Sequence, residues 1–521
     1  MQSSCHMAGN VKDKSQSKTS GGNVMRNCFK LQQENCSINI SDIEFDLKSR
    51  DEMTKLLMGF QHIYNTPEVL DKIFDILKEI IPEGTNMNNG RPGMTLWNIL
   101  VLGTLRLNCK CNFDKVKELA DYHINLRLML QHDLSDRKVY PLQTIKDNLM
   151  LFTPDVLDRI NQVVVGVGHT IAGIQPEDEL KGQCDSSVVK TDVHHPTDTS
   201  LLWDAMRKVI KLIAVLCSYF EITTWRQHHK SLQDIKKLFN YTRKLNKSTS
   251  KIESKKLEQE EVIKEAHREY IDLASKYVEK AKMTILNLRF LGYVPEASIL
   301  KIEKYIMHAE RQIDQIERRV INEETIPHAE KVFSIFQPHT EWISKGKAGV
   351  PQELGLKVCI VKDQFGFILH HRVMQNETDE KITIPITAET KERFPAFNSC
   401  SYDKGFYSPG HREKLNEIID TVILPKKGKL SSEESEIQNT EEFIQGRKNH
   451  PAVESAISAL NNHGLDLCPD HGIDGFKRYV GLAVLGRNIQ ILGHMIQQKE
   501  LKREKRGAQY RITWNENRMA A

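Results

Sequence analysis

The chain opens with a polar segment, and long stretches of helical apolar spacing follow it. Residues 1–48 are rich in Ser, Lys, Gln and Asn, which predicts a flexible tail. Over 49–175 apolar residues recur three and four positions apart, so an all-helical N-terminal region is expected. Thr95 can cap a helix that reaches Leu107, and a turn leads from it to another helix over 113–122. Short helices around a tight turn fit a helix-turn-helix-like DNA-binding module, with a plain bundle for dimer contacts as the alternative.

Strand-like patterns come later and are interrupted by a long helical segment. β-branched residues predict a strand around 185, and 356–362 with 367–374 alternate about a turn, which predicts a β-hairpin. Further strands are expected at 397–403 and 422–425, and a buried helix at 200–218. Residues 226–335 carry the spacing of an antiparallel helical hairpin, with a break at 292–295. The first part of this insertion is basic, which fits either DNA contact or dimer contact.

The C-terminal part combines an acidic surface stretch, a long helix and a basic end. Residues 431–442 are acidic and predict a surface loop, and 473–496 predict an amphipathic helix. That helix contains Gly475, Gly481, Gly486 and Gly493, which would let it pack closely against a neighbour. Residues 497–521 predict an exposed basic tail.

Three acidic residues stand at the edges of these predicted elements. Asp185 in GQCDSSVVKTDV lies on a strand, and Asp403 in FNSCSYDKGFYS ends one. Glu454 in KNHPAVESAISAL lies in the first turn of a helix that Pro451 can open and Gly464 can close. Two Asp from strands and one Glu from a helix can share two divalent metal ions, which suit an in-line phosphoryl displacement.

Six segments in a fixed order give the chain a wider resemblance. They are GRPGMTLWNILVLGTLRL, DSSVVKTDVHHPTDTSLLWDAMRKVI, ISKGKAGVPQELGLKV, SYDKGFYSPGHREKL, VILPKKGKL and HPAVESAISALNNHGLDLCPDHGIDGFKRYVGLAVLGRNI. With them the chain resembles the DDE transposases of bacterial insertion sequences, most closely the ISNCY group. The segments cover most of residues 90–225 and 340–495.

This resemblance implies a fold, an activity and a site. It implies an α/β, RNase H-like catalytic core over 180–225 and 336–496, a mixed sheet flanked by helices, interrupted by the insertion at 226–335. Asp185, Asp403 and Glu454 would be the catalytic and metal-binding triad, with two Mg²⁺ ions, or Mn²⁺ in their place. The partners would be the terminal inverted repeats and the target, both double-stranded DNA, bound by a homodimer. The alternatives are an inactive DNA-binding protein of transposase descent and a standalone metal-dependent nuclease.

Other residues near these motifs have weaker claims. Lys345, Lys347 and Arg447 are placed to meet phosphates, although they also fit ordinary surface cations. Related transposases often carry a basic residue two helical turns after the Glu, where this chain has Leu460 and Asn461. Asp192 and Asp198 lie close to Asp185 in the sequence, but Asp192 would point to the other face of a regular strand and Asp198 fits a helix N-cap.

Composition narrows the class of protein only slightly. A net charge of +4 requires any basic surface to be local. The ten Cys contain no CxxC pair, and His194, His195, His450 and His471 lack HExxH spacing, so zinc chemistry is disfavoured. No apolar run approaches the length of a membrane span, and reduced thiols fit the cytoplasm, here beside the bacterial nucleoid.

Overall fold

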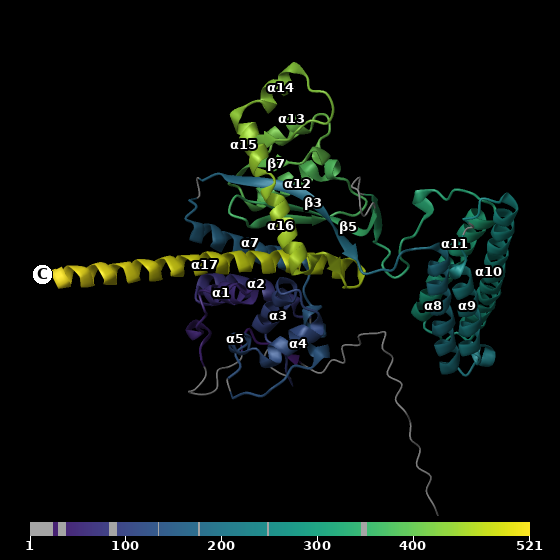
Figure 1. The fold of residues 1–521 in the computed structure, drawn as a ribbon. Coiled ribbons are helices and arrows are strands. Elements are labelled where there is room, and N and C mark those ends of the chain that lie inside the picture. Colours follow the sequence, from purple (N-terminus) through teal and green to yellow (C-terminus); the bar gives the residue numbers. More distant parts are fainter. Residues whose placement is uncertain are drawn as a thin grey trace, which may run out of the picture. The chain divides into compact units, whose positions relative to one another are not determined.

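The protein is mostly helical, with a seven-stranded mixed β-sheet set among the helices (Figure 1) and a separate parallel pair of short strands, β1 Val24–Met25 and β2 Arg91–Pro92. The computed structural model describes residues 24–29, 38–82, 91–133, 135–175, 178–246, 249–344 and 352–520. The chain folds as two compact units. The first contains residues 1–189, 357–470 and 474–521, and the second contains 190–356 and 471–473. Most of the predicted tail, 1–23 and 30–37, lies outside the described residues.

Helices come first in the first unit, as the apolar spacing predicts. They are α1 Glu52–Tyr64, α2 Pro67–Leu77, α3 Leu96–Asn108, α4 Phe113–Tyr122, α5 Ile124–Met129, α6 Leu142–Leu149 and α7 Pro154–Ala172. The predicted cap of α3 is present, because the Thr95 hydroxyl accepts a hydrogen bond from the backbone N–H of Asn98 at 3.2 Å. Every residue of α3 is buried, so α3 is a core helix and not one that can enter a DNA groove.

The sheet follows a mixed order with its first strand in the middle. Its strands are β3 Leu180–Thr191, β4 Glu341–Ser344, β5 Gln352–Lys362, β6 Ile368–Val373, β7 Phe397–Tyr402, β8 Thr421–Ile423 and β9 Leu467–Cys468. Five of them run in the order β6-β5-β3-β7-β8, while β4 adds to the start of β5 and β9 to β3. The predicted hairpin of β5 and β6 is antiparallel, and β3, β7 and β8 are parallel.

Parallel neighbours need crossover connections, and helices supply them here. α12 Asp379–Arg393 leads into β7, and α13 His411–Asn416 links β7 to β8. The helices α14 Ser432–Gln438, α15 Glu441–Asn449 and α16 Ala452–Leu460 follow. The prediction of a surface loop over 431–442 is wrong, because Ser431 and Glu434 form a reciprocal capping box that starts α14.

The last helix, α17 Gly472–Ala520, is longer than predicted and continues through the expected C-terminal tail. Its glycines allow the close packing that the sequence suggests. A Cβ added to Gly493 would lie 1.8 Å from the Lys55 carbonyl oxygen on α1, and one added to Gly59 would lie 2.3 Å from the Ile489 carbonyl oxygen. The backbones of α1 and α17 can approach this closely only where side chains are absent.

Four helices make up most of the second unit, and Figure 1 shows them side by side. They are α8 Asp198–Tyr219, α9 His228–Lys244, α10 Glu253–Phe290 and α11 Glu296–Ile316. The predicted hairpin of α10 and α11 is present. The division differs from the expected boundary at 226, because α8 buries Leu202, Met206 and Ile213 in one core with α10 and α11. The helical unit therefore begins just after β3.

Candidate active site

The register of two parallel strands brings Asp185 and Asp403 to the same edge of the sheet. On β3 and β7 the last paired residues are Cys184 and Tyr402, and each predicted acid is the next residue along the chain. Asp185 lies within β3, which continues to Thr191, whereas Asp403 directly follows the last residue of β7, so both acids lie where the parallel pairing of the two strands ends. The structure thus places two acids that are 218 positions apart in the sequence beside each other.

Glu454 comes from the first turn of α16, as predicted. Pro451 is the N-cap residue, and Val453, Ala456 and Leu460 form the buried stripe that holds the helix in place. Glu454 itself is exposed and lies outside that stripe. Gly464 has a positive φ of 114° in the turn that ends this segment, in agreement with its predicted role.

Electrostatics show that these carboxylates share one environment. The pKa of the Asp185 carboxyl is raised to about 6, first because it is buried. The negative charges of Asp403, Asp379 and Glu454 act in the same direction, so all three lie within electrostatic reach. Only the hydrogen bond from the Ser186 backbone N–H to Asp185 Oδ1, at 2.7 Å, favours the charged form. The charges that act on the Asp185 carboxyl are therefore predominantly negative, and negative charge is in excess around this group.

Asp379 is a fourth member that sequence reasoning missed. It begins α12 and accepts a hydrogen bond of 2.6 Å from the Ser186 hydroxyl, beside Asp185. Its other oxygen accepts a charged hydrogen bond of 2.7 Å from Lys357 Nζ. The signal available in the sequence was the run Thr378–Asp379 before a helical pattern, which indicates a helix start and not a site.

Besides Lys357 on β5, two basic groups near the acids come from α15 and the residue that follows it. Arg447 Nη1 donates to the Tyr402 carbonyl oxygen at 3.1 Å, which holds the guanidinium next to the strand that ends at Asp403. His450 is buried, with Nδ1 3.0 Å from the Ser401 hydroxyl. Burial and the charge of Arg447 lower the pKa of His450, against the opposing charges of Asp403 and Glu454. Lys345 and Lys347, the other predicted phosphate contacts, lie outside the described residues.

The donor chemistry suits a hard divalent cation, but the ligand set is not preassembled. Four carboxylates supply oxygen donors of the kind Mg²⁺ and Mn²⁺ take. Within the described ranges, however, no three His, Cys, Asp or Glu side chains are arranged to hold a metal ion as they stand. Asp403 and Glu454 are exposed, so their side chains can change rotamer without disturbing the core. Asp185, Asp403 and Glu454, with Asp379, are the residues that would hold such ions.

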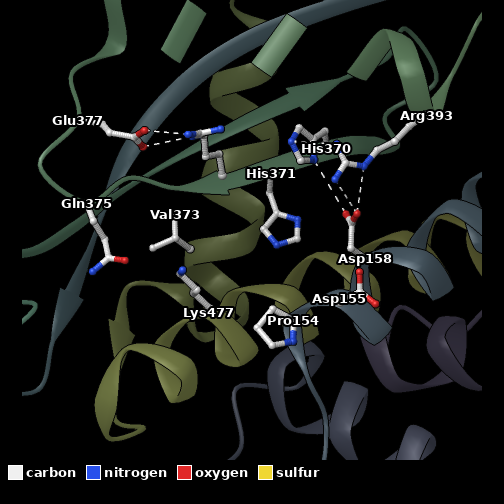
Figure 2. A pocket seen from close by; sticks show the side chains of 11 residues that line it. Pro154, Asp155, Asp158, His370, His371, Val373, Gln375, Glu377, Arg393 and Lys477 are labelled. Atoms are coloured by element: carbon white, nitrogen blue, oxygen red, sulfur yellow. Dashed lines mark hydrogen bonds and ion pairs between the residues drawn. The ribbon is translucent and has the colours of Figure 1, made fainter. Parts of the chain in front are cut away.

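A second cluster of charge in the same unit surrounds a hollow of about 510 Å³ (Figure 2). Its lining contains none of the predicted acids, and its carboxylates are matched by cations. Asp158 accepts hydrogen bonds from Arg393, and Arg372 pairs with Glu377 and Glu389. Neighbouring His370, His371 and Arg393 hold the pKa of Asp158 well below its usual range although burial opposes this. Burial lowers the pKa of His371 to about 4.

The histidines considered for zinc do not converge. His194 lies 2.6 Å from Asp204, His195 packs against Trp342, and His471 contacts Gln337. All three belong to the second unit, whereas His450 belongs to the first. Asp198 is not the cap of α8, because Thr197 fills that position, and Asp198 instead pairs with Arg319.

Comparisons of the chain with protein-family models, with curated proteins and with solved structures found no match. Across the described residues, the helices are all too short or too polar to cross a membrane. The candidate site therefore has to be interpreted from its own geometry and charge.

Proposed function

We propose that the protein is a DDE-type transposase that cuts and joins DNA strands with the help of divalent metal ions. The observation that carries the proposal is the adjacent placement of Asp185 and Asp403 where the parallel pairing of β3 and β7 ends, with Glu454 within electrostatic reach of Asp185. Two strand-borne Asp and one helix-borne Glu are the arrangement that the resemblance implies. The terminal inverted repeats of an insertion sequence and a target DNA are the proposed substrates, bound by a dimer.

The strand order supports an RNase H-like core. Such a core has a first strand in the middle, an antiparallel hairpin on one side of it, and two strands parallel to it on the other. Strands β6-β5-β3-β7-β8 follow this order, and the crossovers α12 and α13 stand where that core has helices. The helical unit is inserted between the first and second strands of this core, after β3.

The residues of the site have distinct tasks in this proposal. Asp185 is fixed by its strand and by the Ser186 backbone, so its carboxylate is the preorganised part of the site. Asp403 and Glu454 are exposed and can turn toward a cation that enters between them and Asp185. When bound, the metal ions would lower the pKa of the attacking hydroxyl and stabilise the leaving oxygen. Arg447, held by the Tyr402 carbonyl, is placed to contact a DNA phosphate.

A strand-transfer assay tests the proposal. The purified full-length protein would be incubated with Mg²⁺ and duplex DNA that carries the sequences flanking its own coding region. Joined products that disappear with Asp403→Asn are expected. Repeat-specific binding without cleavage by the unaltered protein would favour the inactive DNA-binding protein, and cleavage without joining would favour the nuclease.

A further inference from the structure

A basic cleft in the second unit has no role in the proposed chemistry. Its volume is about 350 Å³. Its lining consists of three cations on α8, one aromatic ring and one imidazole, and no carboxylate among the described residues: Arg207, Lys208, Lys211, Phe336 and His471. A hollow with this lining favours an anionic ligand.

The cations are held in place by their neighbours. On α8, Lys211 follows Arg207 by four positions and Lys208 by three. Side chains at these two spacings lie on one side of a helix, so the three cations share one side of α8. The Lys208 ammonium lies 5.3 Å and the Arg207 guanidinium 5.9 Å from the centre of the Phe336 ring. Arg207 also donates to Asp204 at 2.9 Å, and that carboxylate already faces His194. Asp204 therefore orients Arg207 and leaves the lysines uncompensated.

Charge in the helical unit is distributed unevenly along the chain. Residues 205–251 contain 11 Lys or Arg and two Asp or Glu. Residues 252–330 contain 13 Lys or Arg and 16 Asp or Glu. On α10, α11 and the turn after them, many cations are paired with carboxylates: Lys256, Lys264, Arg268, Lys282, Arg289, Arg318 and Arg319. On α8, α9 and the turn between them a further set forms no ion pair within the described part of the chain: Lys208, Lys211, Arg226, Lys230, Lys236, Lys237, Arg243 and Lys244.

We propose that α8 and α9 form a binding surface for the phosphodiester backbone of DNA, with the basic cleft as its phosphate-binding point. The choice of DNA as the polyanion rests on the proposed function. Unpaired cations on one helical pair supply the sequence-independent attraction that phosphates require. The Arg207 guanidinium, which donates through Nη2 to Asp204, lines the cleft and adds its positive charge to that of the two lysines, which suits a phosphate. This surface lies outside the candidate active site and contains none of its residues.

The test is duplex-DNA binding by the full-length protein. Fluorescence anisotropy measures this binding over a range of salt concentrations. The variant is Lys208→Gln with Lys211→Gln, which removes two charges without weakening the helix. The matched control is Lys301→Gln with Lys304→Gln, two exposed lysines with the same spacing on α11. The first variant is expected to bind roughly tenfold more weakly near 0.1 M salt, with a log–log salt slope smaller by about 2. The control should change binding by less than about twofold.

The outcomes separate this inference from the proposed function. A lowered slope in a protein that never cleaves DNA would support the binding surface and count against the transposase. An unchanged slope in an active transposase would overturn the binding surface alone. Equal competition by polyglutamate of the same total charge would also overturn it, because the surface would then bind polyanions without preference for phosphodiesters.

Discussion

Two carboxylate clusters in the first unit differ in how their charge is balanced. Where the parallel pairing of β3 and β7 ends, negative charges surround Asp185, and the pKa of its carboxyl rises to about 6. Around Asp158, Arg393 and Arg372 pair with the carboxylates, and the pKa of the Asp158 carboxyl falls. In a balanced cluster each partly buried charge has a partner, so the loss of one partner is costly, whereas in an unbalanced cluster an excess of one charge lowers stability until a ligand compensates it. The unbalanced cluster is therefore the better candidate for function.

The two carboxylate clusters should differ most in their effect on strand-transfer activity. Asp403→Asn removes one oxygen donor and one charge from the unbalanced cluster, and we expect strand transfer to fall by roughly 10³-fold, or about 4 kcal/mol. Thermal stability should barely change, because the side chain is exposed. Asp192→Asn is the matched control, an exposed Asp close by in the sequence, and should keep full activity. Equal losses in the two variants would contradict the assignment of Asp403.

The largest effect on stability should come from the balanced cluster. Arg393→Ala leaves Asp158 without its guanidinium partner, and these side chains are only 23% and 15% exposed. We expect the free energy of unfolding to fall by roughly 2–4 kcal/mol, measured by urea denaturation. Arg159→Ala is the control, since Arg159 pairs with Glu79 and Asp155 at the surface. It should cost less than about 1 kcal/mol, and similar losses for both arginines would mean that the network does not depend on burial.

Asp185→Asn should act in the opposite direction and stabilise the metal-free protein. The carboxyl of Asp185 has a pKa of about 6 in the folded protein, against about 3.9 in an unfolded chain. Its protonated form thus stabilises the fold at low pH, and this contribution is lost as the pH rises through 6. Allowing for partial exposure, we expect a gain of roughly 1–2 kcal/mol for the variant above pH 6.

The pH dependence of that gain is the decisive measurement. Unfolding of both proteins would be followed from pH 4 to pH 8. The gain should be small near pH 4, increase up to about pH 6 and then stay constant. A gain that is the same at every pH would indicate improved packing in the variant and would remove the evidence for an unbalanced charge.

The smallest expected effect is stabilisation by the metal itself. Mg²⁺ at five times its dissociation constant should add about 1 kcal/mol to the stability of the unaltered protein. Arg393→Ala should keep this increase because the balanced cluster has no part in binding. Asp185→Asn should lose it, and an increase of the same size in that variant would place the Mg²⁺ elsewhere. The readout is the midpoint of thermal unfolding, which needs no DNA and no catalysis.

Local patterns in the sequence were sufficient for most elements. The cap at Thr95, the turn after Lys362 and the proline before α16 each act within a few residues, and each element formed as predicted. The adjacency of Asp185 and Asp403 was expected only from the resemblance, because no local pattern shows which strands are neighbours. Asp379 was missed because its contact with Ser186 spans 193 positions and leaves no local pattern.

Packing partners were harder to predict than elements. The apolar face of α8 predicts that the helix is buried, but it does not identify the elements that cover this face. In the structure α8 packs into the core of the helical unit through residues such as Met206 and Ile210. The acidic stretch after Lys429 looks like a loop by composition, yet its Ser–x–x–Glu spacing starts a helix. The partner of α8 depends on contacts between distant parts of the chain, whereas the start of α14 is a local signal that composition alone hides.

The position of the helical unit between β3 and β5 has a consequence for synthesis of the chain. Strand β3 leaves the ribosome well before its neighbour β5, since about 160 residues lie between them, and translation of that stretch takes roughly 10–30 s. Helical bundles with local contacts fold far faster than this. Early folding of α8–α11 would bring the ends of the two strands together before β5 is finished and would shorten the loop that the sheet must close. The inserted unit would then guide the nascent chain, whatever else it binds in the mature protein.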